Sequence, residues 1–225
     1  SFADMAGQIR QHTEAPIVVG GVGFSVMPER VLSYVDQLSP GSVDAGVWGE
    51  GEFVFSQLAA HLEGGGGTTS SAGCSISTWH DIPNLIWRQG QEDGTNCWQR
   101  NPPVFPSLTH LPAMSRRWVD NVRYFRQGGQ AGIETKRGCP GACTYCADPL
   151  SKGAQMRLRP PSAVVDELAC LLAQGIDHIH TCDSEFNLPG RHVLDICAEI
   201  VRRGLGEKLR WYAYCAPVPF TREMA

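Results

Sequence analysis

The stretch Glu134-Thr-Lys-Arg-Gly-Cys-Pro-Gly-Ala-Cys-Thr-Tyr-Cys-Ala-Asp148 contains three cysteines within eight residues. Their spacing is C-x3-C-x2-C, and Cys139, Cys143 and Cys146 are the candidate metal ligands. Three thiolates can hold three irons of a 4Fe-4S cluster, which leaves the fourth iron open to a ligand that is not protein. The motif therefore predicts an iron–sulfur site at which chemistry can take place.

Two other roles for these cysteines are less favoured. A structural zinc site requires a fourth thiolate or imidazole, usually from a second C-x2-C or H-x3-5-H pair, and no such pair follows Cys146. Disulfides are disfavoured because three cysteines this close cannot all pair locally, and no secretory signal is visible.

The motif, with Tyr145 directly before the third cysteine, resembles the C-x3-C-x-aromatic-C signature of the radical S-adenosylmethionine superfamily. That resemblance implies that S-adenosylmethionine chelates the open iron and that Tyr145 lies in the cofactor-binding loop. It also implies that the reduced cluster cleaves the cofactor to a 5'-deoxyadenosyl radical. An electron donor such as flavodoxin or ferredoxin would then be needed.

Composition is that of an ordinary globular protein of one or two domains. The 225 residues carry a net charge of −4, which gives no reason to expect a nucleic-acid or anionic-membrane partner. Apolar runs are too short to span a bilayer, so we expect a soluble, cytoplasmic protein. Nine cysteines beside an iron–sulfur motif indicate a reducing compartment.

Residues 1–63 alternate between helical and strand periodicity, which predicts parallel strands with helices on both faces. The expected strands are 17–19 and 45–48. The expected helices are an apolar stripe at Phe2, Met5 and Ile9, one starting at Pro28, and one at 53–61. A unit this small with two strands buries too little surface to be complete, so we expect half of a domain.

Both strands of this half-domain end in glycine. Gly20 and Gly21 follow the first strand, and Gly49 and Glu50 follow the second, at positions where backbone can approach a ligand. The stretches 16–29 and 47–52 resemble the C-terminal half of the cobalamin-binding domain that precedes the radical domain in cobalamin-dependent radical enzymes. The resemblance implies that Gly20, Gly21, Gly49 and Glu50 line a cobalamin cleft in a Rossmann-like fold.

Residues 64–130 read as a flexible insertion followed by an inter-domain connector. The tract at 64–71 is rich in glycine, threonine and serine, and four prolines lie between 102 and 112. Between them, residues 85–87 and 97–98 are expected to form a hairpin.

Residues 131–225 show repeated strand and helix periods, with expected strands at 132–136, 176–181 and 209–215. Helices are expected at about 162–172, capped by Ser162, and at 193–203. Such repeats are typical of an α/β barrel, and the resemblance implies the first, truncated units of a partial barrel.

Asp183, Ser184 and Glu185 follow the second of these strands. The resemblance places here the residues that accept hydrogen bonds from the amino group of S-adenosylmethionine, and we expect only one of the two carboxylates to contact it. Arg157 and Arg159 resemble a basic segment that contacts anionic cofactor groups, although a surface role is equally compatible. His178 and His180 are spaced like a metal pair, but hydrogen-bonded histidines are favoured.

These patterns support the hypothesis of a fragment of a cobalamin-dependent radical S-adenosylmethionine enzyme. We expect it to methylate an unactivated carbon of a small molecule or natural-product precursor, and we expect the 225 residues alone to be inactive. An oxidative cyclase or other non-methylating radical enzyme remains an alternative, as does a non-catalytic metal- or cobalamin-binding module.

Overall fold

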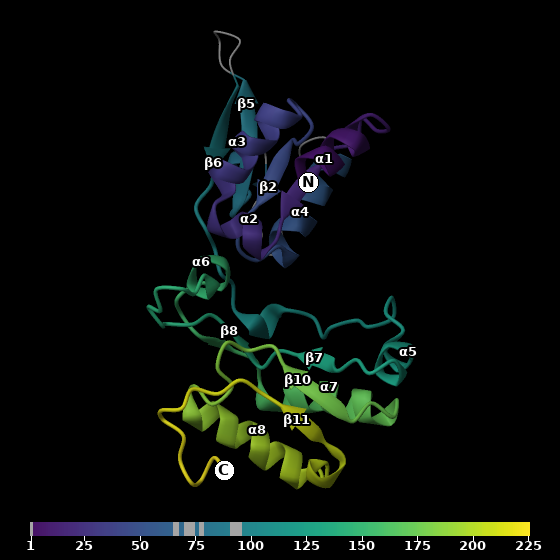
Figure 1. The fold of residues 1–225 in the computed structure, drawn as a ribbon, viewed down its shortest axis with the longest axis vertical. Coiled ribbons are helices and arrows are strands. Elements are labelled where there is room, and N and C mark those ends of the chain that lie inside the picture. Colours follow the sequence, from purple (N-terminus) through teal and green to yellow (C-terminus); the bar gives the residue numbers. More distant parts are fainter. Residues whose placement is uncertain (1, 65–67, 70–74, 77–78, 91–95) are drawn as a thin grey trace. The chain divides into compact units, whose positions relative to one another are not determined.

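The computed structural model describes residues 2–64, 68–69, 75–76, 79–90 and 96–225. The chain forms two compact units (Figure 1), here called the N-terminal unit (Ser1–Phe105 with Ala142–Gly153) and the C-terminal unit (Pro106–Gly141 with Ala154–Ala225). The boundary between the units falls inside the cysteine motif. Cys139 belongs to the C-terminal unit, and Cys143 and Cys146 belong to the N-terminal unit.

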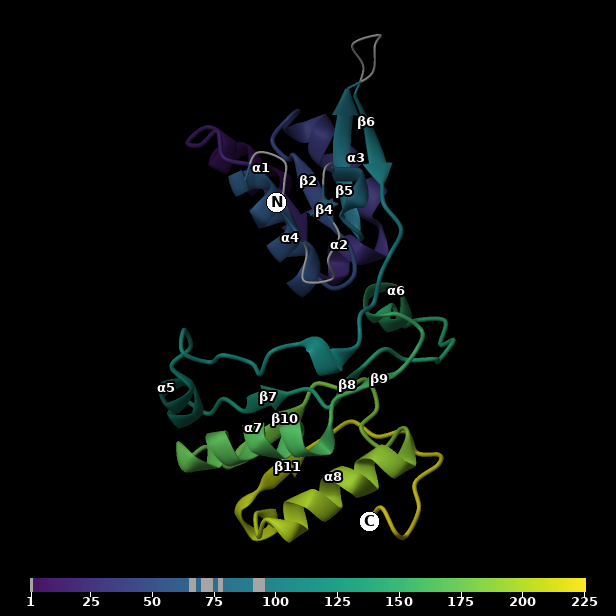
Figure 2. The same cartoon turned by 180° about the vertical axis from the view of Figure 1, so that it is seen from behind.

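The described elements of the N-terminal unit, seen from both sides in Figures 1 and 2, are α1 (Phe2–Arg10), β1 (Val18–Gly20), α2 (Val22–Val26), α3 (Pro28–Leu38), β2 (Ala45–Val47), α4 (Glu52–Gly64), β3 (Thr68–Thr69), β4 (Ser75–Ile76), η1 (Trp79–Asp81), β5 (Leu85–Gly90), β6 (Asn96–Arg100) and α6 (Asp148–Lys152). The expected strands and helices of residues 1–63 are confirmed within a few residues. The tract at 64–71 and Cys74 fall largely outside the described residues.

The main sheet of this unit has the order β1-β2-β5-β6. β1 and β2 are parallel, whereas β2 and β5, and β5 and β6, are antiparallel. The hairpin expected at 85–98 is therefore present, but it extends the sheet of the N-terminal unit instead of lying in a connector. The pairing of Ala45 with Trp87 fixes this register.

Helices cover both faces of the sheet, as the alternation predicted. On one face, Leu32 and Val35 of α3 pack with Val19 of β1. On the other face, Val54 and Leu58 of α4 pack against the neighbouring strands. β2, all of whose residues are buried, is consequently covered on both sides, as parallel strands require.

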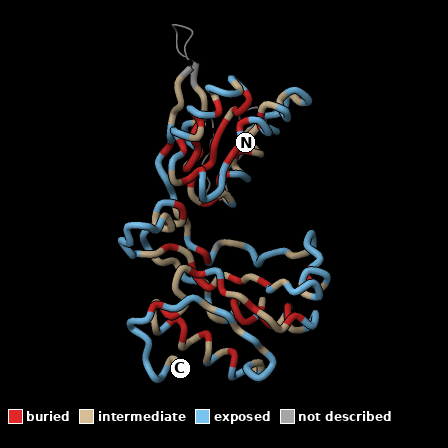
Figure 3. The backbone as a smooth tube through the Cα atoms, viewed as in Figure 1, coloured by how far each residue is buried: buried red, intermediate tan, exposed pale blue. Residues whose placement is uncertain are grey.

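The stripe expected to face the core from α1 is wrong. Phe2, Met5 and Ile9 are 40%, 54% and 44% exposed, and the buried residues of this helix are Ala3 and Ala6. Small side chains let α1 pack against the neighbouring helix α3, and the larger apolar residues are left exposed. Figure 3 colours the backbone by the burial of each residue.

The described elements of the C-terminal unit are η2 (Leu108–His110), α5 (Asn121–Arg126), β7 (Ala131–Ile133), β8 (Lys136–Arg137), β9 (Arg157–Leu158), α7 (Pro161–Ala173), β10 (His178–Thr181), α8 (Gly190–Arg202), η3 (Gly206–Lys208) and β11 (Arg210–Tyr212). The three expected strands are confirmed in shorter form. They build a parallel sheet of order β11-β10-β7.

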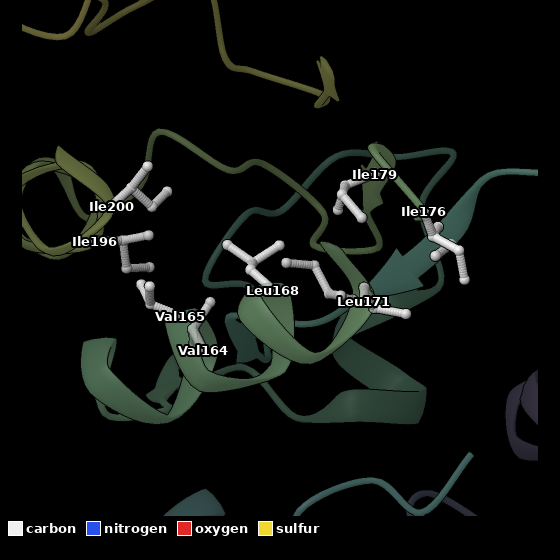
Figure 4. Packing of buried hydrophobic residues seen from close by; sticks show 10 residues of the cluster. Val164, Val165, Leu168, Leu171, Ile176, Ile179, Ile196 and Ile200 are labelled. Carbon is white, nitrogen blue, oxygen red and sulfur yellow. The ribbon is translucent and has the colours of Figure 1, made fainter. Parts of the chain in front are cut away.

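Buried aliphatic residues of α7 and α8 pack against one face of this sheet. Figure 4 shows Leu168 and Leu171 of α7, Ile179 of β10 and Ile196 of α8 in one cluster, and all four are no more than 1% exposed. The cap expected at Ser162 is wrong. The helix begins at Pro161 with Pro160 as its N-cap, because the fixed φ of proline suits the first helical position.

None of the helices in the described residues is long and apolar enough to cross a membrane.

Candidate cofactor-binding site

The cysteine loop begins where β8 ends. Gly138 turns the chain with φ of 87°, and the sulfur of Cys139 accepts a hydrogen bond from the backbone N–H of Gly141 at 3.4 Å. Cys143 and Cys146 are exposed, and the backbone N–H of Cys146 donates to the carbonyl of Cys143 at 3.1 Å. All three cysteines are free thiols.

The chemistry of this donor set fits an iron–sulfur cluster. Three free thiols on one glycine-containing loop can deprotonate and bind iron, and the loop carries no disulfide. No group of three or more histidine, cysteine or acidic side chains is gathered as a metal site among the described residues. The ligand set at Cys139, Cys143 and Cys146 therefore stays a prediction. Tyr145, in the same loop, is 90% exposed.

Asp183 is held by the chain's own donors. Its carboxylate accepts hydrogen bonds from the backbone N–H of Thr135 at 2.8 Å and from the Thr135 hydroxyl at 2.5 Å. It also accepts one from the backbone N–H of Lys136 at 3.3 Å and pairs with the Lys136 ammonium at 3.5 Å. The Asp183 side chain is fully buried. Asp183 therefore makes these contacts within the chain, and its expected role as an acceptor for the S-adenosylmethionine amine stays a prediction.

Lys136 is the buried cation of the same network. Its ammonium donates to the carbonyls of Glu185 at 2.6 Å and Phe186 at 3.3 Å, in addition to its contact with Asp183. Burial lowers the pKa of Lys136, and the neighbouring carboxylate of Asp183 partly opposes that shift.

His192 of α8 joins this network through the backbone. Its Nε2 lies 3.2 Å from the carbonyl of Thr135, so the ring donates a hydrogen bond there. Burial lowers the pKa of His192, which favours the neutral ring.

Ser184 and Glu185 lie just beyond this buried network and are both partly exposed. Within the described part of the chain, the Glu185 carboxylate accepts no hydrogen bond, whereas its carbonyl is held by Lys136. Of the two carboxylates expected near the amine, Glu185 is therefore the one that remains available to a ligand.

The basic and histidine candidates make contacts within the protein. Arg159 pairs with Glu167 at 2.9 Å and donates to the carbonyl of Glu134, and Arg157 donates to the carbonyl of Pro106 at 2.9 Å. These contacts favour a structural role over cofactor binding. His178 is hydrogen-bonded to Asp177 at 2.7 Å, as the non-metal interpretation predicted.

The glycines of the N-terminal unit lie at the carboxyl ends of β1 and β2. Gly21 has φ of 95° and ψ of 176°, and Gly49 has φ of 82°. Both conformations are costly for any residue with a Cβ. Gly20 is the last residue of β1, and Glu50 is buried. The parallel pairing of Gly20 with Val47 brings the two loops to one edge of the sheet.

Ser25 of α2 joins these two loops and was missed by the sequence analysis. Its hydroxyl donates to the carbonyl of Gly21 at 2.8 Å and accepts from the backbone N–H of Gly49 at 2.9 Å. Lys136 and His192 were missed in the same way. A lysine inside the stretch that leads into the cysteines was the one signal that could have drawn attention to the second network.

Comparison with known proteins assigns the class. No protein-family model matches this sequence. The chain is nevertheless a homologue, over nearly its whole length, of the cobalamin-dependent radical S-adenosylmethionine enzymes.

Among individual relatives, it is 34% identical to the tryptophan 2-C-methyltransferase of Streptomyces laurentii, a match that covers 97% of this chain and 42% of that protein. It is also similar to the radical S-adenosylmethionine methyltransferase TsrM of Kitasatospora setae. That structure, with cobalamin and a [4Fe-4S] cluster bound, superimposes with a TM-score of 0.76 at 33% identity, covering 99% of this chain and 41% of TsrM.

A third relative shares the fold at lower identity. The cobalamin-dependent S-adenosylmethionine radical enzyme OxsB superimposes with a TM-score of 0.66 at 21% identity and covers 93% of this chain. The chain thus has a mixed α/β fold with parallel strands like that of TsrM, and spans less than half of the length of these relatives.

Proposed function

We propose that this chain is part of a cobalamin-dependent radical S-adenosylmethionine enzyme that methylates an unactivated carbon of a small molecule. The observation that carries the proposal is the loop of three free cysteines, Cys139, Cys143 and Cys146, at the end of a strand that a buried ion pair anchors. Similarity to a tryptophan 2-C-methyltransferase over 97% of the chain supports methyl transfer.

In this proposal, the three cysteines hold a 4Fe-4S cluster that leaves one iron open. When bound, the cluster supplies one-electron reduction of S-adenosylmethionine, and a cobalamin supplies a carrier for the methyl group. An electron donor such as flavodoxin or ferredoxin would reduce the cluster. The exposure of Cys143 and Cys146 makes their sulfurs accessible to iron.

The S-adenosylmethionine site is assigned to Tyr145 of the cysteine loop and to Ser184 and Glu185 after β10. A carboxylate on a rigid support can accept a hydrogen bond from an amine at fixed distance. Glu185 meets that condition because its backbone is held by Lys136 while its carboxylate accepts no hydrogen bond among the described residues. Asp183 supports this segment indirectly, because it pairs with Lys136, which holds the Glu185 carbonyl.

Cobalamin binding is assigned to the glycine edge, which comprises Gly20, Gly21, Gly49 and Glu50. Positive φ values at Gly21 and Gly49 favour glycine at the ends of β1 and β2, where open α/β sheets bind ligands, and an added Cβ at Gly21 would meet nothing within 4 Å. This assignment implies that β1 and β2 are half of a Rossmann-like domain. The parallel strands β7, β10 and β11 would likewise be the first units of a partial (β/α) barrel.

The test is anaerobic reconstitution of the intact gene product, followed by iron and cobalt analysis. We expect a cluster that needs all three cysteines, so Cys143→Ala abolishes the brown absorbance and turnover, since two thiolates hold a cubane poorly. Cys170→Ala, at an exposed cysteine of α7 outside the motif, is the matched control and keeps both. A full iron complement in the Cys143 variant, or no bound cobalamin in the wild type, would contradict the proposal.

Product mass separates methylation from the alternatives. A gain of one methylene unit in the substrate supports methyl transfer, whereas a mass loss of hydrogen supports oxidative ring closure. A non-catalytic module would produce no 5'-deoxyadenosine from S-adenosylmethionine, so detection of that product by the intact protein excludes it.

A further inference from the structure

We propose that Lys136 is a positioning residue for S-adenosylmethionine, because its buried ammonium holds the backbone that presents Glu185. The inference rests on the proposed function and extends it to a residue outside the cysteine loop and outside the predicted amine-binding residues. All of its contacts lie inside the C-terminal unit.

Three acceptors hold the ammonium of Lys136. Its side chain is 3% exposed and has three acceptors: the Asp183 carboxylate at 3.5 Å and the carbonyls of Glu185 at 2.6 Å and Phe186 at 3.3 Å. A buried ammonium is retained only where acceptors satisfy it. Two of the three acceptors are main-chain carbonyls of the segment that carries the candidate amine ligand.

The segment around Glu185 is held on both sides. Beyond Glu185, the backbone N–H of Phe186 donates to the carbonyl of Tyr214 at 2.6 Å. Asn187, 1% exposed, donates to the carbonyls of Ala216 at 2.9 Å and Pro219 at 2.7 Å. Glu185 thus lies between an anchor at Lys136 and an anchor at Asn187, while its own carboxylate makes no hydrogen bond within the described residues.

Lys136 also lies close to the cysteine loop in the chain. Lys136 belongs to β8, three residues before Cys139, and the Asp183 carboxylate fastens the same strand through Thr135. One buried ion pair therefore fixes both the stem of the cysteine loop and the backbone of Glu185. A ligand that bridges an iron and a carboxylate needs both in register, and displacement by about 1 Å is enough to weaken such a site strongly.

The most informative variant removes both members of the Lys136–Asp183 ion pair. Lys136→Met alone would leave Asp183 buried without its cation, so the test uses Lys136→Met combined with Asp183→Asn, which removes both charges together. Lys208→Met, at an exposed lysine of η3, is the matched control for loss of one lysine. Each variant is made in the intact gene product and is reconstituted with iron and sulfide in the absence of oxygen.

We expect the double variant to keep the iron content and the cluster's electron paramagnetic resonance signal of the wild type. Its dissociation constant for S-adenosylmethionine, measured by equilibrium dialysis, should rise about tenfold or more, in line with the loss of supporting contacts around a metal site. Amide hydrogen exchange in residues 184–187 should accelerate. The Lys208 variant should match the wild type in all three measurements.

A cycle with Glu185 distinguishes positioning from general stability. If Lys136 acts through Glu185, adding Lys136→Met and Asp183→Asn to a Glu185→Gln background should change the dissociation constant less than about twofold. Equal effects with and without Glu185→Gln would overturn the inference. Should the double variant not accumulate as folded protein, Lys136→Gln combined with Asp183→Asn, which keeps a side-chain donor at position 136 and removes both charges, carries the same measurements.

The outcomes separate the inference from the function on which it rests. If the cluster-loaded wild type does not bind S-adenosylmethionine, the proposed function and this inference fail together. If the wild type binds it and the double variant binds equally well, only the role of Lys136 is overturned.

Discussion

The two units fasten the ends of their parallel strands by opposite means. At the glycine edge, one uncharged hydroxyl, that of Ser25, joins the loops after β1 and β2. At the ends of β7 and β10, a buried ion pair and several hydrogen bonds join Thr135 and Lys136 to Asp183. At Gly21 the first edge leaves backbone with nothing within 4 Å of an added Cβ, and the second edge fixes charged groups in place.

The same position in an α/β sheet can thus serve two purposes. A loop with glycine at a positive φ has no side chain at that position, which allows close approach to the backbone. Buried charges lower the stability of the fold unless each charge has its partner. A complete pair fixes the geometry of the groups that it joins. Each of the following experiments probes one side of this contrast.

The largest effect is expected from Asp183→Ala. The change leaves the Lys136 ammonium and the Thr135 hydroxyl buried without their carboxylate, which should cost about 3–5 kcal/mol. Native-state hydrogen exchange of the β10 amides measures this in the C-terminal unit alone. A loss below about 1 kcal/mol would mean that water replaces the carboxylate and that the pair is not tightly buried.

Gly49→Ala should be the most costly change at the glycine edge. Backbone strain at φ of 82° costs about 1–2 kcal/mol, and an added Cβ would lie 2.9 Å from Nδ2 of Asn84 and 3.3 Å from the Phe105 ring. Gly41→Ala is the matched control, because Gly41 has φ of 70° and an added Cβ there would meet nothing within 4 Å. Exchange of the β2 amides should show the larger loss for Gly49, and equal losses would argue against crowding.

The charged edge also predicts a pH dependence. The pKa of His192 is lowered in the folded state by burial, so the unfolded chain binds its proton first as pH falls. The stabilising contribution is complete above the unfolded value near 6.5 and is lost as pH drops below it, by at most about 1.4 kcal/mol per pH unit. Nearby Lys136, Asp183 and Asp195 also act on this ring. His192→Gln should flatten the acid limb of the stability profile, and an unchanged slope would assign it elsewhere.

Ser25→Ala should have the smallest effect on stability, about 1 kcal/mol, because an ordinary neutral hydrogen-bond partner is lost. Its informative readout is cobalamin retention by the intact protein, since the loops after β1 and β2 lose their link. Ser56→Ala, at an exposed hydroxyl of α4, is the matched control. Full retention of cobalamin in the Ser25 variant would separate this hydroxyl from the proposed cleft.

Local patterns in the sequence predicted most of the strands and helices. The run of β-branched residues at 17–19 was sufficient to predict β1, and the proline at position 28 was sufficient to predict the start of α3. Both signals act over a few residues. The cysteine motif indicated the class of enzyme for the same reason, because its three cysteines are close together in the sequence.

Features that depend on distant partners could not be predicted. Pairing of β5 with β2 and of Asp183 with Lys136 joins segments about 40 residues or more apart, and no local pattern specifies the partner. The face of α1 was wrong because close helix packing on Ala3 and Ala6 outweighed the size of its apolar residues. Burial of Asp183 was likewise hidden, because a carboxylate after a strand looks the same whether it faces a ligand or a buried lysine.

The exposure of Cys143 and Cys146 has a practical consequence. Until iron arrives, both sulfurs are open to oxygen, which converts accessible thiolates to sulfenic acid and then to disulfides or irreversible acids. Exposure of a preparation to air should therefore determine the fraction of molecules that can still bind a cluster. Correct folding should matter less for that fraction.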